Sequence, residues 1–170
     1  MLSKTKKYYF PGIFFLLLSF FTIYKFKDIN SNHIHFLFVL LICISTDIGG
    51  YVFGKIFKGP KLTKISPNKT FSGVIGSYLL SIGLINIFFQ FSFFFEYENS
   101  FSLKILLLVI LISTISQLGD ILISYFKRKS NVKDTGNIIP GHGGLLDRVD
   151  GMIFAFPFSY IIYLLNFFKE

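Results

Sequence analysis

The acidic residues of this chain gather where apolar sequence meets basic, glycine-rich sequence. Only nine of the 170 residues are Asp or Glu. Five of them lie in or beside two polar segments: Asp47, Asp120, Asp134, Asp147 and Asp150. Asp47 and Asp120 also lie inside apolar runs, where a carboxylate is costly unless it meets a partner or a wet cavity. Both are therefore functional candidates, and the alternative is an ion pair that only joins helices.

The residues that follow Asp120 are spaced as if they form one site. Asp120, Ser124 and Lys127 have the spacing i, i+4 and i+7, which places them on one helical face. Asp147 and Asp150 lie about one turn apart at the start of the last apolar run, near the positive end of a helix dipole. Carboxylate oxygens suit Mg²⁺, which proteins often hold with one or two carboxylates and phosphate oxygens. We therefore expect a metal-phosphate site.

A glycine-rich stretch, PGHGG at residues 140–144, lies within the same polar segment. Glycines let the backbone approach a ligand closely, so that N–H groups can point at a phosphate. Such a stretch is weak evidence alone. Its basic and acidic neighbours strengthen the interpretation, because KRK begins at Lys127, Lys133 and Asp134 follow, and DRVD ends at Asp150.

The remaining sequence indicates a membrane protein. The chain is 52% hydrophobic with 24 Phe residues, and its mean hydropathy is +0.62. Crossing a hydrocarbon core takes roughly 20 helical residues, and without water the backbone must form helices. Five apolar runs reach or nearly reach this length, near 9–25, 34–54, 72–95, 102–125 and 149–168. We predict an all-α, polytopic helical membrane bundle of about five transmembrane helices, in one domain spanning residues 1–170.

The basic residues predict the orientation of this bundle. Thirteen of the 17 Lys and Arg residues fall on one side, in the first residues and in two loops at about 55–72 and 126–148. The positive-inside rule places that side in the cytoplasm. The N-terminus and both predicted active-site loops are therefore expected to be cytoplasmic.

The segment from Ser124 to Asp150 resembles the signature of the phosphatidate cytidylyltransferases, also called CDP-diacylglycerol synthases. That signature is a serine, then KR, KD, a glycine, a proline, HGG and DRxD, in this order and spacing. Its elements stand here as Ser124, Lys127, Arg128, Lys133, Asp134, Gly136, Pro140, His142, Gly143, Gly144, Asp147, Arg148 and Asp150. The resemblance continues upstream and covers about residues 45 to 155, with matches at Asp47, Gly50, Tyr51, Gly54, Ser66, Pro67, Lys69, Thr70, Gly73, Gly119 and Asp120.

The chain departs from the family pattern in two places. Ser72 stands where family members often have an acidic residue. Members also tend to have several helices before the one that carries Asp47, whereas this chain has one such run. The first departure concerns a polar contact to substrate or metal, and the second concerns the wall through which lipid enters.

The resemblance implies transfer of a cytidylyl group from CTP to phosphatidic acid, with Mg²⁺ as cofactor and a second cation left open. Asp120 and Asp147 are the preferred metal ligands, followed by Asp150. Side chains expected to act on the phosphates or in the reaction are Lys127, Arg128, Lys133, Asp134, His142 and Arg148. Residues expected to bind substrate are Asp47, Tyr51, Ser66, Lys69, Thr70, Ser124, Gly143 and Gly144.

Two other functions share some of these features. A CTP-dependent polyprenol or phytol kinase would need similar metal and basic groups, and a cation channel or transporter would use intramembrane carboxylates. The complete HGG and DRxD elements favour the cytidylyltransferase over the kinase. We expect a bacterial inner-membrane protein whose active site faces the cytoplasm, with CTP, phosphatidic acid and the bilayer as partners. We expect no nucleic acid partner, and the sequence leaves the oligomeric state open, a homodimer included.

Overall fold

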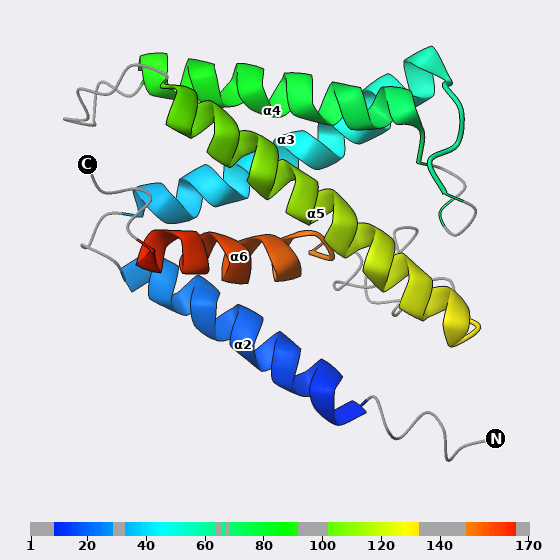
Figure 1. Cartoon of the computed structure of the whole chain (residues 1–170), viewed down its shortest axis with the longest axis horizontal. Helices are drawn as coiled ribbons and strands as arrows, with labels where there is room; N and C mark the ends of the chain where they lie inside the picture. Colours follow the sequence, from blue (N-terminus) through cyan, green and yellow to red (C-terminus); the bar gives the residue numbers. More distant parts are fainter. Residues whose placement is uncertain are drawn as a thin grey trace, which may run out of the picture.

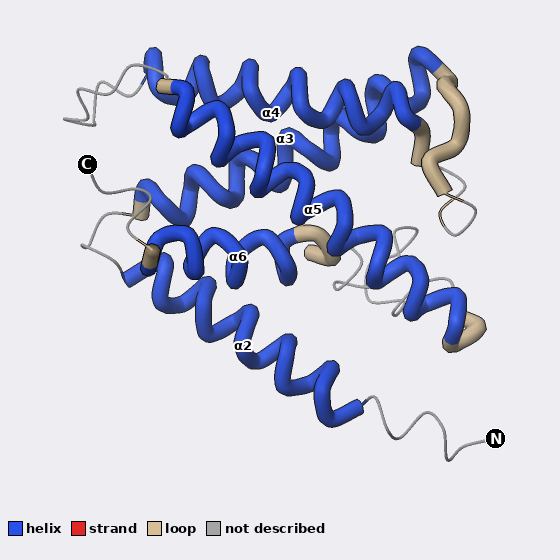
Figure 2. The backbone as a smooth tube through the Cα atoms, in the orientation of Figure 1, coloured by secondary structure: helices blue, strands red, loops and turns tan. Residues whose placement is uncertain are grey.

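A computed structural model describes residues 9–28, 33–63, 66, 69–91, 102–132 and 149–165. These residues form a bundle of helices (Figures 1 and 2). The helices are α2 (Tyr9–Asp28), α3 (Ile34–Phe57), α4 (Phe71–Phe91), α5 (Leu103–Lys129) and α6 (Met152–Leu164). Among the described residues, β-pairing is limited to one isolated bridge between Lys61 and Thr70. The predicted all-α fold is confirmed.

Three helices are long and apolar enough to cross a membrane: α3, α4 and α5. The apolar parts of α2 and α6, Gly12–Phe26 and Met152–Leu164, are shorter. Helix α5 continues to Lys129, so the predicted loop at 126–148 begins inside a helix. Lys127 and Arg128 consequently project from the last turn of α5.

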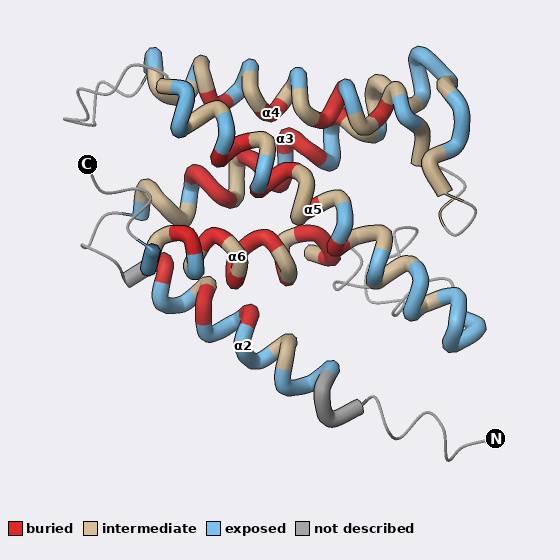
Figure 3. Tube along the Cα trace, in the orientation of Figure 1, coloured by how far each residue is buried: buried red, intermediate tan, exposed pale blue. Residues whose placement is uncertain are grey.

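The core lies where α3, α5 and α6 meet, and the buried positions of these helices face one another (Figure 3). Val39, Ile42, Ile112 and Phe156 are members of this apolar cluster. Large apolar residues also remain exposed on the outer faces of the helices, as expected where lipid is the solvent. Burial inside the bundle is therefore confined to the surfaces between helices.

Helices α3 and α4 pair closely because small residues face each other. A Cβ atom on Gly49 would lie 2.6 Å from the carbonyl oxygen of Gly76, and one on Gly76 would lie 2.2 Å from Cβ of Phe53. Small residues at such a crossing let two membrane helices approach backbone to backbone. This approach brings the start of α4 beside the last turns of α3.

The end of α3, the start of α4 and the end of α5 lie on the right in Figure 1, and the start of α6 lies near the middle, beside α5. The segments that lead into α4 and α6 are the ones expected to carry the site. The topology therefore brings the described loop before α4 and the described turn before α6 into contact with α5.

Candidate functional site

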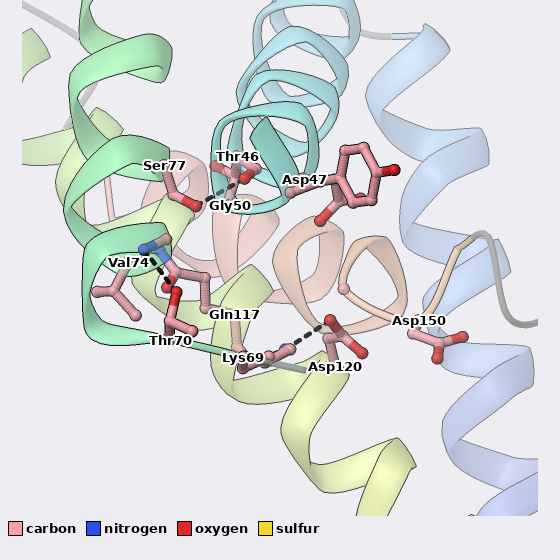
Figure 4. Close-up of a pocket in the computed structure, with 13 residues that line it drawn as sticks. Thr46, Asp47, Gly50, Lys69, Thr70, Val74, Ser77, Gln117, Asp120 and Asp150 are labelled. Carbon is pink, nitrogen blue, oxygen red and sulfur yellow. Dashed lines mark hydrogen bonds and ion pairs between the residues drawn. The ribbon is translucent and has the colours of Figure 1, made fainter. Parts of the chain in front are cut away.

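A cavity of about 300 Å³ lies between α3, α4, α5 and the start of α6 (Figure 4). Both charged and neutral polar side chains contribute to its walls. The residues that line it are Thr46, Asp47, Gly50, Tyr51, Lys69, Thr70, Gly73, Val74, Ser77, Gln117, Asp120, Asp150 and Gly151.

An ion pair between Lys69 and Asp120 crosses the cavity. The Nζ atom of Lys69 lies 2.5 Å from Oδ2 of Asp120, and the two side chains are 24% and 33% exposed. Figure 4 shows this contact as a dashed line. Nζ also donates to the backbone oxygen of Gln117, at 3.4 Å. One side chain from the loop before α4 thus reaches the middle of α5.

Backbone hydrogen bonds in that loop set the position of Lys69. The amide of Leu62 donates to the carbonyl of Lys69 at 2.8 Å, and the amide of Lys69 donates to the carbonyl of Ser66 at 3.1 Å. Thr70 then begins α4, because its side-chain oxygen accepts from the amide of Gly73, as an N-cap residue does. The backbone of Lys69 is held on both sides, while its side chain extends into the cavity.

A second ion pair joins the end of α5 to the start of α6. The Nζ atom of Lys127 donates to Oδ2 of Asp150 at 3.0 Å, with the two side chains 14% and 6% exposed. Gly151 lets this segment approach α5, since a Cβ atom there would lie 2.3 Å from Oγ of Ser116. Asp150 therefore lines the cavity from a closely packed turn.

Asp47 and Tyr51 form the α3 wall of the cavity, one helical turn apart. Asp47 makes no hydrogen bond or ion pair with any residue that the structure describes. The Nζ atom of Lys55 lies 5.6 Å from the centroid of the Tyr51 ring. Asp47 thus adds a further carboxylate to the cavity wall.

Part of the cavity lining is polar but uncharged. Thr46 donates to Ser113 at 2.9 Å, and Ser77 donates to the carbonyl of Thr46 at 2.7 Å. The Gln117 amide nitrogen donates to the same Ser113 oxygen at 3.4 Å. These bonds satisfy polar groups that would be costly in a membrane. These residues therefore contribute neutral polar groups to the lining beside the charged ones.

The oxygen donors around the cavity fit the chemistry of Mg²⁺, which takes carboxylate and phosphate oxygens. Asp47, Asp120 and Asp150 supply carboxylates to the walls. Within the described part of the chain, no three His, Cys, Asp or Glu side chains converge into a metal-holding group. The donor set therefore suits a cation held by one or two carboxylates together with a bound phosphate.

The structure brings some of the predicted site residues together and leaves others apart. Asp47, Tyr51, Lys69, Thr70, Asp120 and Asp150 line one cavity, and Ser66 contacts Lys69 through the backbone. Ser124, Lys127 and Arg128 lie on α5 but do not line this cavity. The other predicted residues lie outside the described residues: Lys133, Asp134, His142, Gly143, Gly144, Asp147 and Arg148.

Sequence reasoning missed the neutral lining of the cavity, Thr46, Ser77 and Gln117. Gln117 precedes Asp120 by three residues, which places it on the same helical face. A polar amide inside an apolar run was a usable signal for it. Thr46 and Ser77 gave no such signal, because hydroxyl side chains are common in membrane helices, where they bond to nearby carbonyls.

Ser72, where the family often has an acid, does not line the cavity. Its hydroxyl accepts from the amide of Gly59 at 3.3 Å and bonds to the hydroxyl of Thr70 at 3.0 Å. Ser72 therefore links the start of α4 to the loop that follows α3.

Comparison with known proteins finds a family match over most of the chain. The sequence model of the cytidylyltransferase family matches residues 1–166. A phosphatidate cytidylyltransferase of Rickettsia felis is 44% identical over 87% of this chain and 66% of its own length. One of Rickettsia bellii is 47% identical over 79% of this chain and 61% of its own length. One of Staphylococcus epidermidis is 38% identical over 95% of this chain and 63% of its own length. The chain thus spans less than two thirds of each of these relatives.

Proposed function

Since this chain belongs to the cytidylyltransferase family, we propose that it transfers the cytidylyl group of CTP to phosphatidic acid. The products are CDP-diacylglycerol and pyrophosphate. The observation that carries the proposal is the single cavity that joins Asp47, Lys69, Asp120 and Asp150, in a chain 44% identical to a protein named phosphatidate cytidylyltransferase.

The residues of the cavity suit a reaction that needs no protein nucleophile. A phosphate-monoester oxygen of phosphatidic acid attacks the α-phosphorus of CTP. The bond from that phosphorus to the bridging oxygen of the β-phosphate breaks, and pyrophosphate leaves with the electron pair. The protein then has to position two anionic substrates and neutralise their charge. Carboxylates and lysines, rather than a Ser-His or Cys-His pair, are the groups required.

We assign roles from the walls of the cavity. Lys69 and Thr70 contact the phosphates of CTP from the loop before α4, where the first amides of a helix also favour anions. Asp120 and Asp150 hold the cation, with Asp147, three residues before Asp150 in the sequence, as a further ligand. A bound Mg²⁺ would neutralise phosphate charge as it develops in the transition state. Asp47 faces the same space and orients the substrate or a second cation.

We propose that the protein lies in the inner membrane of a bacterium and that its site faces the cytoplasm. Lysines are concentrated at the end of the bundle that holds the cavity, as the positive-inside rule requires of a cytoplasmic side.

The test of this orientation is to replace Cys43 and label single cysteines placed at Ser66 and Ser130 with a membrane-impermeant reagent. Labelling of both from the cytoplasmic face is expected, and labelling from opposite faces would contradict a shared site.

The chemistry is tested by following two labels in CTP. Membranes or purified protein are incubated with phosphatidic acid, Mg²⁺ and CTP labelled at either the α- or the γ-phosphate. We expect lipid to take up only the α-label while pyrophosphate is released. Transfer of the γ-label, with CDP as the released nucleotide, would instead identify a lipid kinase.

A further inference from the structure

We propose that Lys69 acts as an internal counter-cation for Asp120, which a divalent metal must displace, so that CTP and metal bind cooperatively. The identity of the nucleotide rests on the proposed function. The displacement itself concerns only this pair of side chains and can be measured separately.

The proposal begins with the contact between the two side chains. Nζ of Lys69 lies 2.5 Å from Oδ2 of Asp120, so the ammonium occupies a position that a metal ion would need at that oxygen. Both residues line the cavity and are partly exposed, so water and small ions reach the pair. A cation that binds Asp120 through this oxygen therefore competes directly with Lys69.

The chain allows Lys69 to leave Asp120 without unfolding. Its backbone is fixed by the bonds to Leu62 and Ser66, while its four-carbon stem is flexible. The adjacent Thr70 and the start of α4 form the wall at which phosphates are expected. A triphosphate there offers the ammonium oxyanions in place of one carboxylate, and charge-assisted bonds of that kind are strong.

The consequence is a coupling between two ligands. When the nucleotide attracts Lys69, Asp120 loses its counter-ion and binds the metal more tightly. Thermodynamic linkage requires the converse, so the metal must raise the affinity for the nucleotide by the same factor. Without nucleotide, Lys69 keeps Asp120 neutralised and disfavours metal binding at an empty site.

The experiment measures Mn²⁺ binding to detergent-purified protein by electron paramagnetic resonance, without nucleotide or lipid. Lys69→Met and Lys69→Gln remove the ammonium, and Lys69→Arg retains a cation. Lys61→Met is the matched control, because it removes a lysine from the same loop that does not line the cavity. We expect Lys69→Met and Lys69→Gln to bind Mn²⁺ about two- to fivefold more tightly than wild type, as the loss of a partly exposed pair predicts. Lys69→Arg and Lys61→Met should stay within about twofold.

A second arm repeats the titration in the Asp120→Asn background. There the Lys69→Met change should no longer raise Mn²⁺ affinity, because the competing carboxylate is gone. Unchanged or weaker Mn²⁺ binding in both Lys69→Met and Lys69→Gln would overturn the proposal, as would an equal gain in Lys61→Met. Failure of the proposed function is distinguishable, since it would appear as absent CDP-lipid with the Mn²⁺ result intact.

Discussion

The two lysine–aspartate pairs at the cavity use the same chemistry in different surroundings. In the Lys69–Asp120 pair both side chains line the cavity and are about a quarter to a third exposed. In the Lys127–Asp150 pair the side chains are 14% and 6% exposed, and Lys127 does not line the cavity. Both side chains of the first pair line the cavity, whereas the second pair reaches it through Asp150 alone.

The comparison predicts different roles for the two lysines, because Lys69 lines the cavity and Lys127 does not. An exposed pair contributes little to stability because water screens it. Breaking a buried pair by removing one partner is costly because the remaining charge is left without compensation. We therefore expect changes at Asp120 to affect function first and changes at Lys127 to affect stability first.

The largest expected effect is the loss of activity in Asp120→Asn. The substitution keeps the shape of the side chain but removes the charge that faces the cavity, which should lower cytidylyl transfer by about 10²- to 10³-fold. CDP-lipid formation from α-labelled CTP provides the measurement. The melting temperature in detergent should remain near that of wild type. Activity close to wild type would remove Asp120 from the proposed metal ligands.

A comparable change at the buried pair, Lys127→Met, should act on stability. Asp150 would keep a buried charge without this partner, which predicts a loss of about 3 kcal/mol in the free energy of unfolding. Denaturation in mixed micelles, with Lys129→Met on the same helix end as control, gives the comparison. Adding Asp150→Asn to Lys127→Met should recover much of the loss. Equal stability of Lys127→Met and Lys129→Met would show that the pair does not hold α5 to α6.

The sequence predicted the helices, and it singled out acidic residues of which Asp47, Asp120 and Asp150 line the cavity. Long apolar runs in a membrane leave the helix as the available structure, and Asp47 and Asp120 were conspicuous inside them. The partner of Asp120 was not predictable. Lys69 and Asp120 are far apart in the sequence, and they meet only because the loop turns back at the Lys61–Thr70 bridge.

Lys127 is a second residue whose contact the sequence did not predict. Its i+7 spacing from Asp120 correctly placed it on α5, and the sequence assigned it to the phosphates along with its neighbours. The described contact is instead with Asp150 of the α6 turn. That contact depends on the close approach of Gly151 to Ser116, which is a tertiary feature that helical spacing does not reveal. The phosphate role of Lys127 stays a prediction.

A third test concerns the close crossing of α3 and α4, which positions the loop that carries Lys69. Gly76→Ala would place a Cβ atom 2.2 Å from Cβ of Phe53, so α4 must move away from α3 at a cost of about 2 kcal/mol. Gly83→Ala, on the same helix, meets nothing within 4 Å and is the control. Because α4 begins beside Lys69, Gly76→Ala should also weaken CTP binding. Equal stability of the two variants would contradict the close crossing of α3 and α4.

The smallest expected effect concerns Ser72, which bonds to Thr70, the neighbour of Lys69 in the Lys69–Asp120 pair. Its hydroxyl accepts from the amide of Gly59 and bonds to Thr70, so Ser72→Ala should cost about 1 kcal/mol of stability through two lost hydrogen bonds. Ser72→Asp keeps an acceptor at this position and should retain more of that stability.

Ser72 does not line the cavity, and a remote bond contributes little to the transition state. The turnover rate of Ser72→Ala at saturating CTP should therefore change by less than about twofold. Thermal unfolding and steady-state kinetics on the same preparations decide the matter. A large fall in turnover without loss of stability would mean that Ser72 contacts a substrate, as the acid found in other family members was expected to do.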